Sequence, residues 1–313
     1  MNPRSPCERS VRWLCMVLAL AGSLFAAAAR AAAPATLEVT VRGPEGPGDT
    51  RYDYDTGVLR LALEKTRARY GNYRIVTAPP MNFSRAIASA STDTYPNFFI
   101  KLSYEARYVD ALNLDYVRFP VDLGIVGYRV CFMHPDLKAE LAKATSLDAL
   151  RRFTIGQGRD WADVSILRGN GFNVVEVDQY ESLFRMVAAR RFDLFCRGTN
   201  ELLDEYNAHQ DLPGLSYDES FSIAYPLPRF FYTHKRNAAA IARVQEGIRL
   251  AHKDGSLQVL WREKYGDSVD LARLDKRRVF WIENPLLKDV DFDYRQYFFD
   301  PLKQDVRTAP PRR

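Results

Sequence analysis

Apolar and polar residues alternate along the first third of the chain in a pattern that predicts short strands joined by helices. Residues 37–41 alternate with a period of two, as a half-buried strand does, and a loop rich in Gly, Pro and Asp covers 43–53. A helix capped by Thr56 and ended by Gly71 is predicted next, followed by a strand over 73–77. The order strand, helix, strand is typical of a parallel sheet covered by helices.

The same alternation continues through a second block, which the pattern predicts to be a structural unit of its own. A strand is expected over 98–102, and a strongly β-forming run over 121–133, with glycines at 124 and 127, predicts a long strand that can pass between two bodies. Within 131–222 we expect strands over 153–157, 174–177 and 193–196, and helices over 136–143, 146–151, 160–168, 181–190 and 199–206.

The chain then returns through an extended stretch over 222–234, and two helices follow, the first capped by Asn237 and the second over 256–265. We therefore expect an α/β protein in which two lobes are joined by two crossing segments, near 121–131 and 222–232. Ligands of open α/β sheets bind beyond the carboxyl ends of the strands, so a ligand cleft is expected between the lobes.

The first 31 residues predict export. Arg4, Arg9 and Arg12 precede an apolar run over 13–29, and Ala29-Arg30-Ala31 is a cleavage site of the small-x-small type. The alternative is an uncleaved membrane anchor, but the run is shorter than the roughly 20 residues that a spanning helix needs. We expect a cleaved signal peptide and a periplasmic protein.

This division predicts a set of domain boundaries and changes the charge of the chain. We expect a signal peptide over 1–31, the first part of lobe 1 over 32–130, an inserted lobe 2 over 131–222, the second part of lobe 1 with a C-terminal extension over 223–307, and a loose tail over 308–313. The leader contains four arginines and one glutamate, so its removal lowers the formal charge from +5 to +2. A nearly neutral protein without a sustained basic face is not expected to bind nucleic acid.

Two of the four cysteines, Cys131 and Cys196, remain after the leader is removed. A disulfide can persist in the periplasm, but the sequence does not supply the geometry that a bridge requires. One bridge and two buried thiols therefore both remain open.

Two segments of the second block contain candidate ligand-binding residues. Gly156-Gln157-Gly158 turns toward a helix that begins near Trp161, which can offer free backbone N–H groups to an anion or can simply be a tight turn. Asp193, Arg197 and Glu201 surround the end of another strand, where they can hold an amino group and a carboxylate or form an internal ion pair.

The other lobe is expected to contribute Arg107 as a second cation and Tyr54 as an aromatic wall, opposite Trp161. Neither a Gly-x-Ser-x-Gly elbow, an HExxH motif nor a phosphate-binding loop is present in the sequence, and the four histidines lack metal-ligand spacing. We expect no cofactor, no metal and no enzymatic activity. Because acid–base carboxylates need no local motif, a dehydratase-type enzyme that uses Glu201 or Glu105 as its acid remains the alternative.

An ordered set of segments resembles the family 3 extracellular solute-binding proteins of ABC transporters, over most of 37–266. The segments are Ser103-x-Glu105-x-Arg107, Ile155-Gly-Gln-Gly158, Arg191-Phe-Asp193, Tyr225-Pro226, Lys253-Asp-Gly-Ser-Leu257 and Trp261-x-x-Lys-Tyr-Gly266. The resemblance implies a periplasmic-binding-protein-like fold of type II. It also implies a monomeric periplasmic protein that captures a small polar solute, anionic or zwitterionic and similar to an amino acid, for an inner-membrane ABC permease.

In amino-acid-binding members of this family, an arginine at the place of Arg107 binds the ligand's α-carboxylate, and an aspartate near Asp193 receives its ammonium group. The chain lacks the glycine and threonine that usually precede that arginine and the Phe-Ser-x-Pro-Tyr segment that usually follows it. Arg197 and Glu201 are therefore expected to take over part of the recognition. An orphan sensing or protein-interaction module remains a further alternative.

Overall fold

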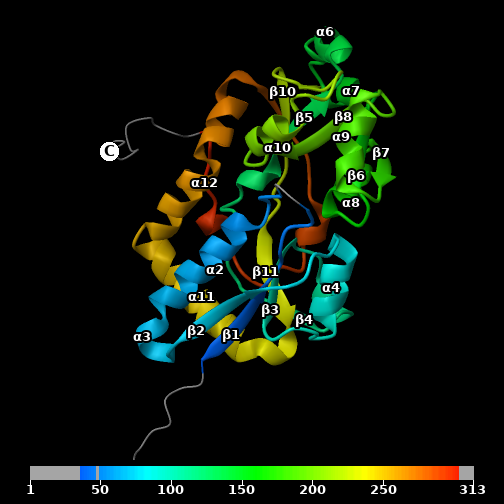
Figure 1. The fold of residues 1–313 in the computed structure, drawn as a ribbon. Helices are drawn as coiled ribbons and strands as arrows, with labels where there is room; N and C mark the ends of the chain where they lie inside the picture. Colours follow the sequence, from blue (N-terminus) through cyan, green and yellow to red (C-terminus); the bar gives the residue numbers. More distant parts are fainter. Residues whose placement is uncertain (1–35, 47–48, 303–313) are drawn as a thin grey trace, which may run out of the picture. The chain divides into compact units, whose positions relative to one another are not determined.

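The protein is described from a computed structural model, which covers residues 36–46 and 49–302 (Figure 1). The predicted signal peptide and the predicted tail over 308–313 lie outside these residues. Two separate sheets, one of five strands and one of seven, organise the described chain. Within the described residues, none of the helices combines the length and the apolar character that crossing a membrane requires.

The first sheet has the strand order β2-β1-β3-β11-β4. Its strands are β1 (Leu37–Val41), β2 (Tyr73–Thr77), β3 (Phe98–Ser103), β4 (Leu114–Tyr116) and β11 (Arg229–His234). β1 runs parallel to β2 and β3, whereas β11 is antiparallel to β3 and β4. The helices of this lobe are α2 (Asp53–Lys65), α3 (Arg67–Tyr70), α4 (Phe83–Ser91), α5 (Ala106–Asp110), α11 (Ala238–Lys253) and α12 (Ser256–Ala272).

Helix α2 begins at Asp53, three residues before the predicted cap Thr56, with Asp53 and Asp55 in its first turn. Carboxylates are favourable there because the N-terminus of a helix has positive partial charge. The helix packs against α11 so closely that a Cβ at Gly247 would lie 2.0 Å from the carbonyl oxygen of Ala62, so only glycine fits at this contact.

The second sheet has the order β12-β10-β5-β8-β6-β7, and β9 pairs with β5 beside this path. Its strands are β5 (Tyr128–Met133), β6 (Thr154–Gly158), β7 (Asn173–Val177), β8 (Leu194–Gly198), β9 (Ser216–Tyr217), β10 (Phe221–Ala224) and β12 (Arg278–Trp281). Its helices are α6 (Lys138–Leu141), α7 (Leu147–Leu150), α8 (Ala162–Gly169), α9 (Tyr180–Ala188) and α10 (Leu202–His209). The expected two-lobe α/β architecture is confirmed.

Two segments cross between the sheets and hydrogen-bond to each other along the way. Val121 N donates to Arg229 O at 2.9 Å, and Tyr225 N donates to Gly127 O at 3.1 Å. The long strand predicted over 121–133 is wrong in its first half, because Leu123 and Gly124 have positive φ (51° and 80°) and a 3-10 turn covers Ile125–Gly127. These residues are apolar because they are buried in the crossing, not because they form a strand.

The C-terminal segment departs from the expected division, which assigned it to lobe 1. β12 pairs in parallel with β10 at the edge of the second sheet. The chain then contacts lobe 1, where Asp291 accepts hydrogen bonds from Tyr116 (2.8 Å) and Arg118 (2.9 Å). The segment thus joins the two lobes a third time. The sequence did not show this because the strand partner of β12 lies more than fifty residues away.

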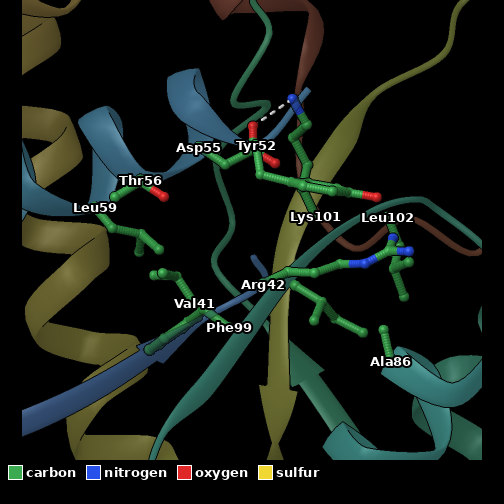
Figure 2. Close-up of a pocket in the computed structure, with 11 residues that line it drawn as sticks. Val41, Arg42, Tyr52, Asp55, Thr56, Leu59, Ala86, Phe99, Lys101 and Leu102 are labelled. Atoms are coloured by element: carbon green, nitrogen blue, oxygen red, sulfur yellow. Dashed lines mark ion pairs between the residues drawn. The ribbon is translucent and has the colours of Figure 1, made fainter. Parts of the chain in front are cut away.

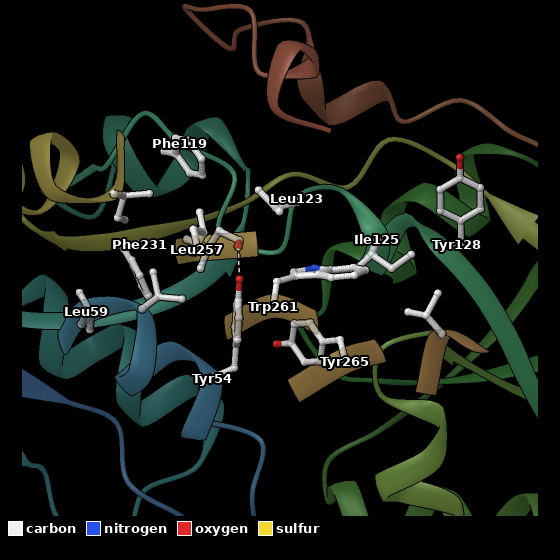
Figure 3. Close-up of a cluster of buried hydrophobic side chains, with 14 of the residues drawn as sticks. Tyr54, Leu59, Phe119, Leu123, Ile125, Tyr128, Phe231, Leu257, Trp261 and Tyr265 are labelled. Carbon is white, nitrogen blue, oxygen red and sulfur yellow. Dashed lines mark hydrogen bonds between the residues drawn. The ribbon is translucent and has the colours of Figure 1, made fainter. Parts of the chain in front are cut away.

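A buried aromatic cluster fixes the crossing segment against helices α2 and α12 (Figure 3). Tyr54 donates to Val121 O at 2.8 Å, and Trp261 Nε1 donates to Asp122 O at 3.1 Å. The rings of Tyr54 and Tyr265 lie 4.5 Å apart, a separation typical of favourable aromatic pairs. Tyr54, predicted as a ligand wall, is therefore part of the core at 2% exposure.

Candidate functional site

A cavity of about 380 Å³ lies between the lobes at the ends of strands from both sheets. The basic residues that line it are Arg42, Arg51, Lys101, Arg159, Arg197 and Arg229. The acidic residues are Glu45, Asp55, Glu105, Asp163, Asp178 and Glu201. The aromatic residues are Tyr52, Phe83, Tyr108, Trp161 and Tyr180. The two signs of charge are equally represented, so the lining as a whole is formally neutral.

Contacts between the lobes lie at the rim of this cavity. The Arg51 guanidinium lies 4.2 Å from the ring centroid of Tyr180 in the other lobe, within the range of a cation–π interaction. Ser84 donates a hydrogen bond to Asp160 at 3.4 Å, again from one lobe to the other.

Arg197 lines the cavity from the end of β8, as predicted, but most of its donors are already used within the protein. Its Nε lies 2.8 and 3.0 Å from the two carboxylate oxygens of Glu205, and its Nη2 lies 2.9 Å from Glu201. The ring of Trp161 covers the guanidinium at 4.8 Å. The residue is only 3% exposed. The internal ion pair that the sequence left open is thus the observed arrangement.

The pKa values of the two carboxylates beside Arg197 are shifted in opposite directions. Burial opposes ionisation of Glu201, but Arg197, Arg229 and Arg129 together hold its pKa well below the usual range. For Glu205, burial outweighs Arg197 and raises the pKa. The Tyr180 hydroxyl donates to Glu205 at 2.8 Å, so this carboxylate is fixed from a third side. Glu201 is therefore an ionised, hydrogen-bonded group.

A second buried charge cluster lies across the cavity, in lobe 1. The Lys101 ammonium lies 2.6 Å from Asp55 and 2.7 Å from Asp122. Figure 2 shows the Lys101 side chain turned toward Asp55 beside a small cavity of about 20 Å³, room for about one water molecule. Sequence reasoning missed this cluster, although a lysine inside the apolar strand run over 98–102 was a visible signal.

We expect Asp55 to give the protein a measurable pH dependence. Burial and the nearby Asp122 raise the pKa of Asp55 to about 6, while Lys101 and Arg229 act in the opposite direction. The pKa in the folded protein exceeds the ordinary aspartate value of 3.8, so the stabilisation by protonation is fully present below pH 3.8 and is lost as pH rises through about 6.

The free energy of unfolding of the wild type, relative to Asp55→Asn, should therefore fall between about pH 4 and pH 6 and be level above pH 7. Urea unfolding of both proteins at each pH measures this difference. A difference that rises with pH over the same interval would contradict the assignment.

The glycine-rich segment before α8 is closely packed. A Cβ at Gly156 would lie 2.2 Å from the Phe192 ring, and one at Gly158 would lie 2.4 Å from Trp161. Helix α8 begins at Ala162, later than predicted, and its first turn already contains the carboxylate of Asp163. That carboxylate lies 2.7 Å from Arg129. Gly158 and Trp161, two of the predicted ligand-binding residues, line the cavity.

Four of the predicted ligand residues are not part of the cavity lining. Gln157 is fully buried, and its Nε2 donates to Cys196 O at 3.1 Å. Asp193 accepts from the backbone N and the hydroxyl of Thr154, both at 2.7 Å. Arg107 is exposed and pairs with Glu105 at 2.8 Å. Tyr54 belongs to the core described above. Their positions give these side chains structural partners instead of a surface that faces the cavity.

Cys131 and Cys196 form a disulfide. They stand directly opposite each other on the antiparallel strands β5 and β8, and both are buried. The bridge connects β5, the strand that leaves the crossing, with β8, the strand that contains Arg197. Of the two alternatives left open by the sequence, the bridge is the one observed.

Comparisons with known proteins support the fold. No protein-family model matches the chain, and none of the curated proteins is similar to it in sequence. Solved structures do match. The ligand-binding core of GluR0 in complex with L-glutamate has a TM-score of 0.54 and 12% identity, and the match covers 74% of this chain and 98% of that one.

Two further structures match over similar lengths. The periplasmic VFT2 domain of BvgS from Bordetella pertussis has a TM-score of 0.53 and 18% identity, covering 73% of this chain and 93% of that one. A structure from a study of glutathione import via GshT and the cystine ABC importer TcyBC of Streptococcus mutans has a TM-score of 0.53 and 12% identity. The match covers 74% of this chain and 95% of that one. The chain therefore has the two-lobed fold of periplasmic-binding-protein-like domains.

Proposed function

We propose that this protein binds one small polar solute in the cavity between its lobes and does not catalyse a reaction on it. The observation that carries the proposal is the cavity of about 380 Å³, whose charged and aromatic lining comes from both lobes. A volume in this range suits small-molecule ligands, and charged groups held in place by their neighbours can orient a polar solute. L-Glutamate and glutathione, named for two of the similar structures, indicate the size of ligand to be tested.

We propose that the protein works outside the cytoplasmic membrane, in the periplasm, and the predicted signal peptide supports this. There the protein would deliver the solute to a membrane partner. An ABC permease is the partner that the family resemblance favours. A sensor is the second candidate, because a histidine kinase sensor domain with similarity to periplasmic binding proteins has a similar fold. We propose that the protein acts as a monomer and needs no cofactor.

An enzyme on the same fold is the less supported alternative. A dehydratase needs a general acid that is protonated near neutral pH. Glu201 has a pKa well below the usual range because three arginines surround it. Glu105 accepts hydrogen bonds from Arg107 at 2.8 Å and from Tyr108 at 2.9 Å. These contacts support a role in orienting charges over a role in proton transfer.

Thermal unfolding with a panel of solutes tests the proposal. The panel contains the L-amino acids, mono- and dicarboxylates, glutathione, short peptides, polyamines and an extract of bacterial small molecules. A solute at a hundred times its Kd should add about 2.7 kcal/mol to the free energy of unfolding. If no member of the panel, including the extract, raises the unfolding temperature, solute binding is contradicted.

A further inference from the structure

The cations of the cavity differ in how fully their hydrogen-bond donors are occupied. Lys101 contacts two carboxylates, at 2.6 and 2.7 Å. Arg197 uses Nε and Nη2 on Glu205 and Glu201. Arg42 donates to Glu45 at 2.6 Å and to the carbonyl oxygen of Met81 at 3.0 Å. Each of these cations already has close partners within the protein.

Arg229 is different. The carboxylate oxygens nearest to its Nη1 belong to Asp122, at 3.6 Å, and Glu201, at 3.5 Å. Both carboxylates have closer donors, Lys101 at 2.7 Å and Arg197 at 2.9 Å respectively. Within residues 36–46 and 49–302, the Arg229 guanidinium makes no hydrogen bond, although its side chain is only 21% exposed. It lines the cavity with its charge-assisted donors still available.

The strand register places a second polar group beside Arg229. Arg229 on β11 stands directly opposite Ser103 on β3, so the two side chains leave the sheet on the same face. Lys101 precedes Ser103 by two residues and shares that face. All three residues line the cavity. In the described part of the chain, the Ser103 hydroxyl makes no hydrogen bond, so it adds a free donor next to the guanidinium.

We infer that Arg229 and Ser103 form the anchor for a carboxylate group of the solute, at the floor of the cavity where β11 leaves the crossing segment. This inference rests on the proposed function and deepens it, because it makes the solute an organic acid or a zwitterion. A guanidinium presents parallel N–H groups that match a carboxylate in a bidentate arrangement, and the hydroxyl supplies a third donor.

The anchor differs from the position that the family resemblance implied. Arg107 is half exposed, contacts Glu105 at 2.8 Å and does not line the cavity. Arg229, in contrast, lies between Asp122 of the crossing segment and Glu201 of lobe 2, so an acid bound to it is in reach of both lobes. The aromatic walls Trp161 and Tyr180 offer packing surface to a flat or apolar body of such an acid.

The test uses the full chain and compares acids with the matching amides, in which an uncharged carboxamide group replaces the carboxylate. Calorimetric titrations use benzoate against benzamide, succinate against succinamide, and L-phenylalanine against L-phenylalaninamide. The proteins are the wild type, Arg229→Gln and the matched control Arg107→Gln. Unfolding without ligand is measured first for each variant. If Arg229→Gln does not fold, Arg229→Lys takes its place. Lysine keeps the positive charge but lacks the parallel N–H groups that bind a carboxylate in a bidentate arrangement.

We expect at least one of these acids to bind the wild type at least tenfold more tightly than its amide. Arg229→Gln should weaken the binding of that acid by about ten- to a hundredfold, because a charge-assisted contact is lost. Arg229→Lys should weaken the binding by less. Both variants should change the affinity for the amide by less than the affinity for the acid, because a neutral carbonyl makes a weaker contact with the guanidinium. Arg107→Gln should bind the acid like the wild type.

Three results would overturn the anchor. The first is an unchanged acid affinity in Arg229→Gln, and the second is an equal loss in Arg107→Gln. The third is binding of neutral or cationic members of the solute panel while no acid binds. Each of these leaves solute binding itself intact. Absence of binding by the whole panel instead contradicts the proposed function, so the two failures are distinguishable.

Discussion

Replacing Arg197 by Met is expected to lower the free energy of unfolding by about 3 to 5 kcal/mol, because removing one partner of a buried ion pair leaves the other uncompensated. The carboxylates of Glu201 and Glu205 both lie against this guanidinium, and all three side chains are largely buried. Chemical denaturation of the wild type and the variant measures the loss. The expected loss in free energy of unfolding is much larger than the loss from removing a solvent-exposed ion pair.

Two further variants separate this explanation from a general effect of losing an arginine. Arg159→Met removes an exposed arginine that contacts Asp178 and Glu176, and its unfolding midpoint should stay close to that of the wild type. Adding Glu201→Gln and Glu205→Gln to Arg197→Met removes the uncompensated charges, and this should restore part of the stability. Equal stability of Arg197→Met and the wild type would show that the buried network does not support the fold.

Loss of the disulfide is the second large effect that we expect. The bridge closes a loop with a sequence separation of 65, and removal of such a constraint from the unfolded chain costs about 4 kcal/mol in the chain-entropy model. The double variant Cys131→Ala with Cys196→Ala should lose this amount, as measured by urea unfolding without reductant.

Reduction supplies the matched control for that comparison. Unfolding the wild type in dithiothreitol should bring its stability close to that of the double variant, whereas dithiothreitol should not change the double variant. A double variant as stable as the oxidised wild type would contradict a stabilising bridge. Because Arg197 directly follows Cys196 on β8, we also expect the bridge to help position that guanidinium.

Local patterning was sufficient to predict most of the strands. The strands expected over 37–41 and 73–77 are β1 and β2 without change, and those over 98–102, 153–157 and 174–177 are displaced by one residue at one end or at both. These segments have period-two alternation or continuous apolar runs, and both depend only on neighbours in sequence. The crossing near 121–127 misled the same reasoning, because burial on several sides gives an apolar run without a strand.

The site was harder to predict, because it depends on which charges meet in space. The sequence placed Arg197 and Glu201 at the end of one strand, and these residues do line the cavity. The sequence did not show that Glu205, one helical turn after Glu201, would accept a hydrogen bond from Arg197 Nε. Arg229 was overlooked because it follows two prolines in an irregular segment, and only its pairing with Ser103 shows that it faces the cavity.

The measurement that tests the central claim most directly is solute binding by a variant whose cavity is filled. Ser103→Trp places a bulky ring on the face of β3 that lines the cavity, while Val259→Trp adds the same ring at an exposed position on α12. A solute that raises the unfolding temperature of the wild type should do the same for Val259→Trp and should fail with Ser103→Trp. Full stabilisation of Ser103→Trp by that solute would contradict binding between the lobes.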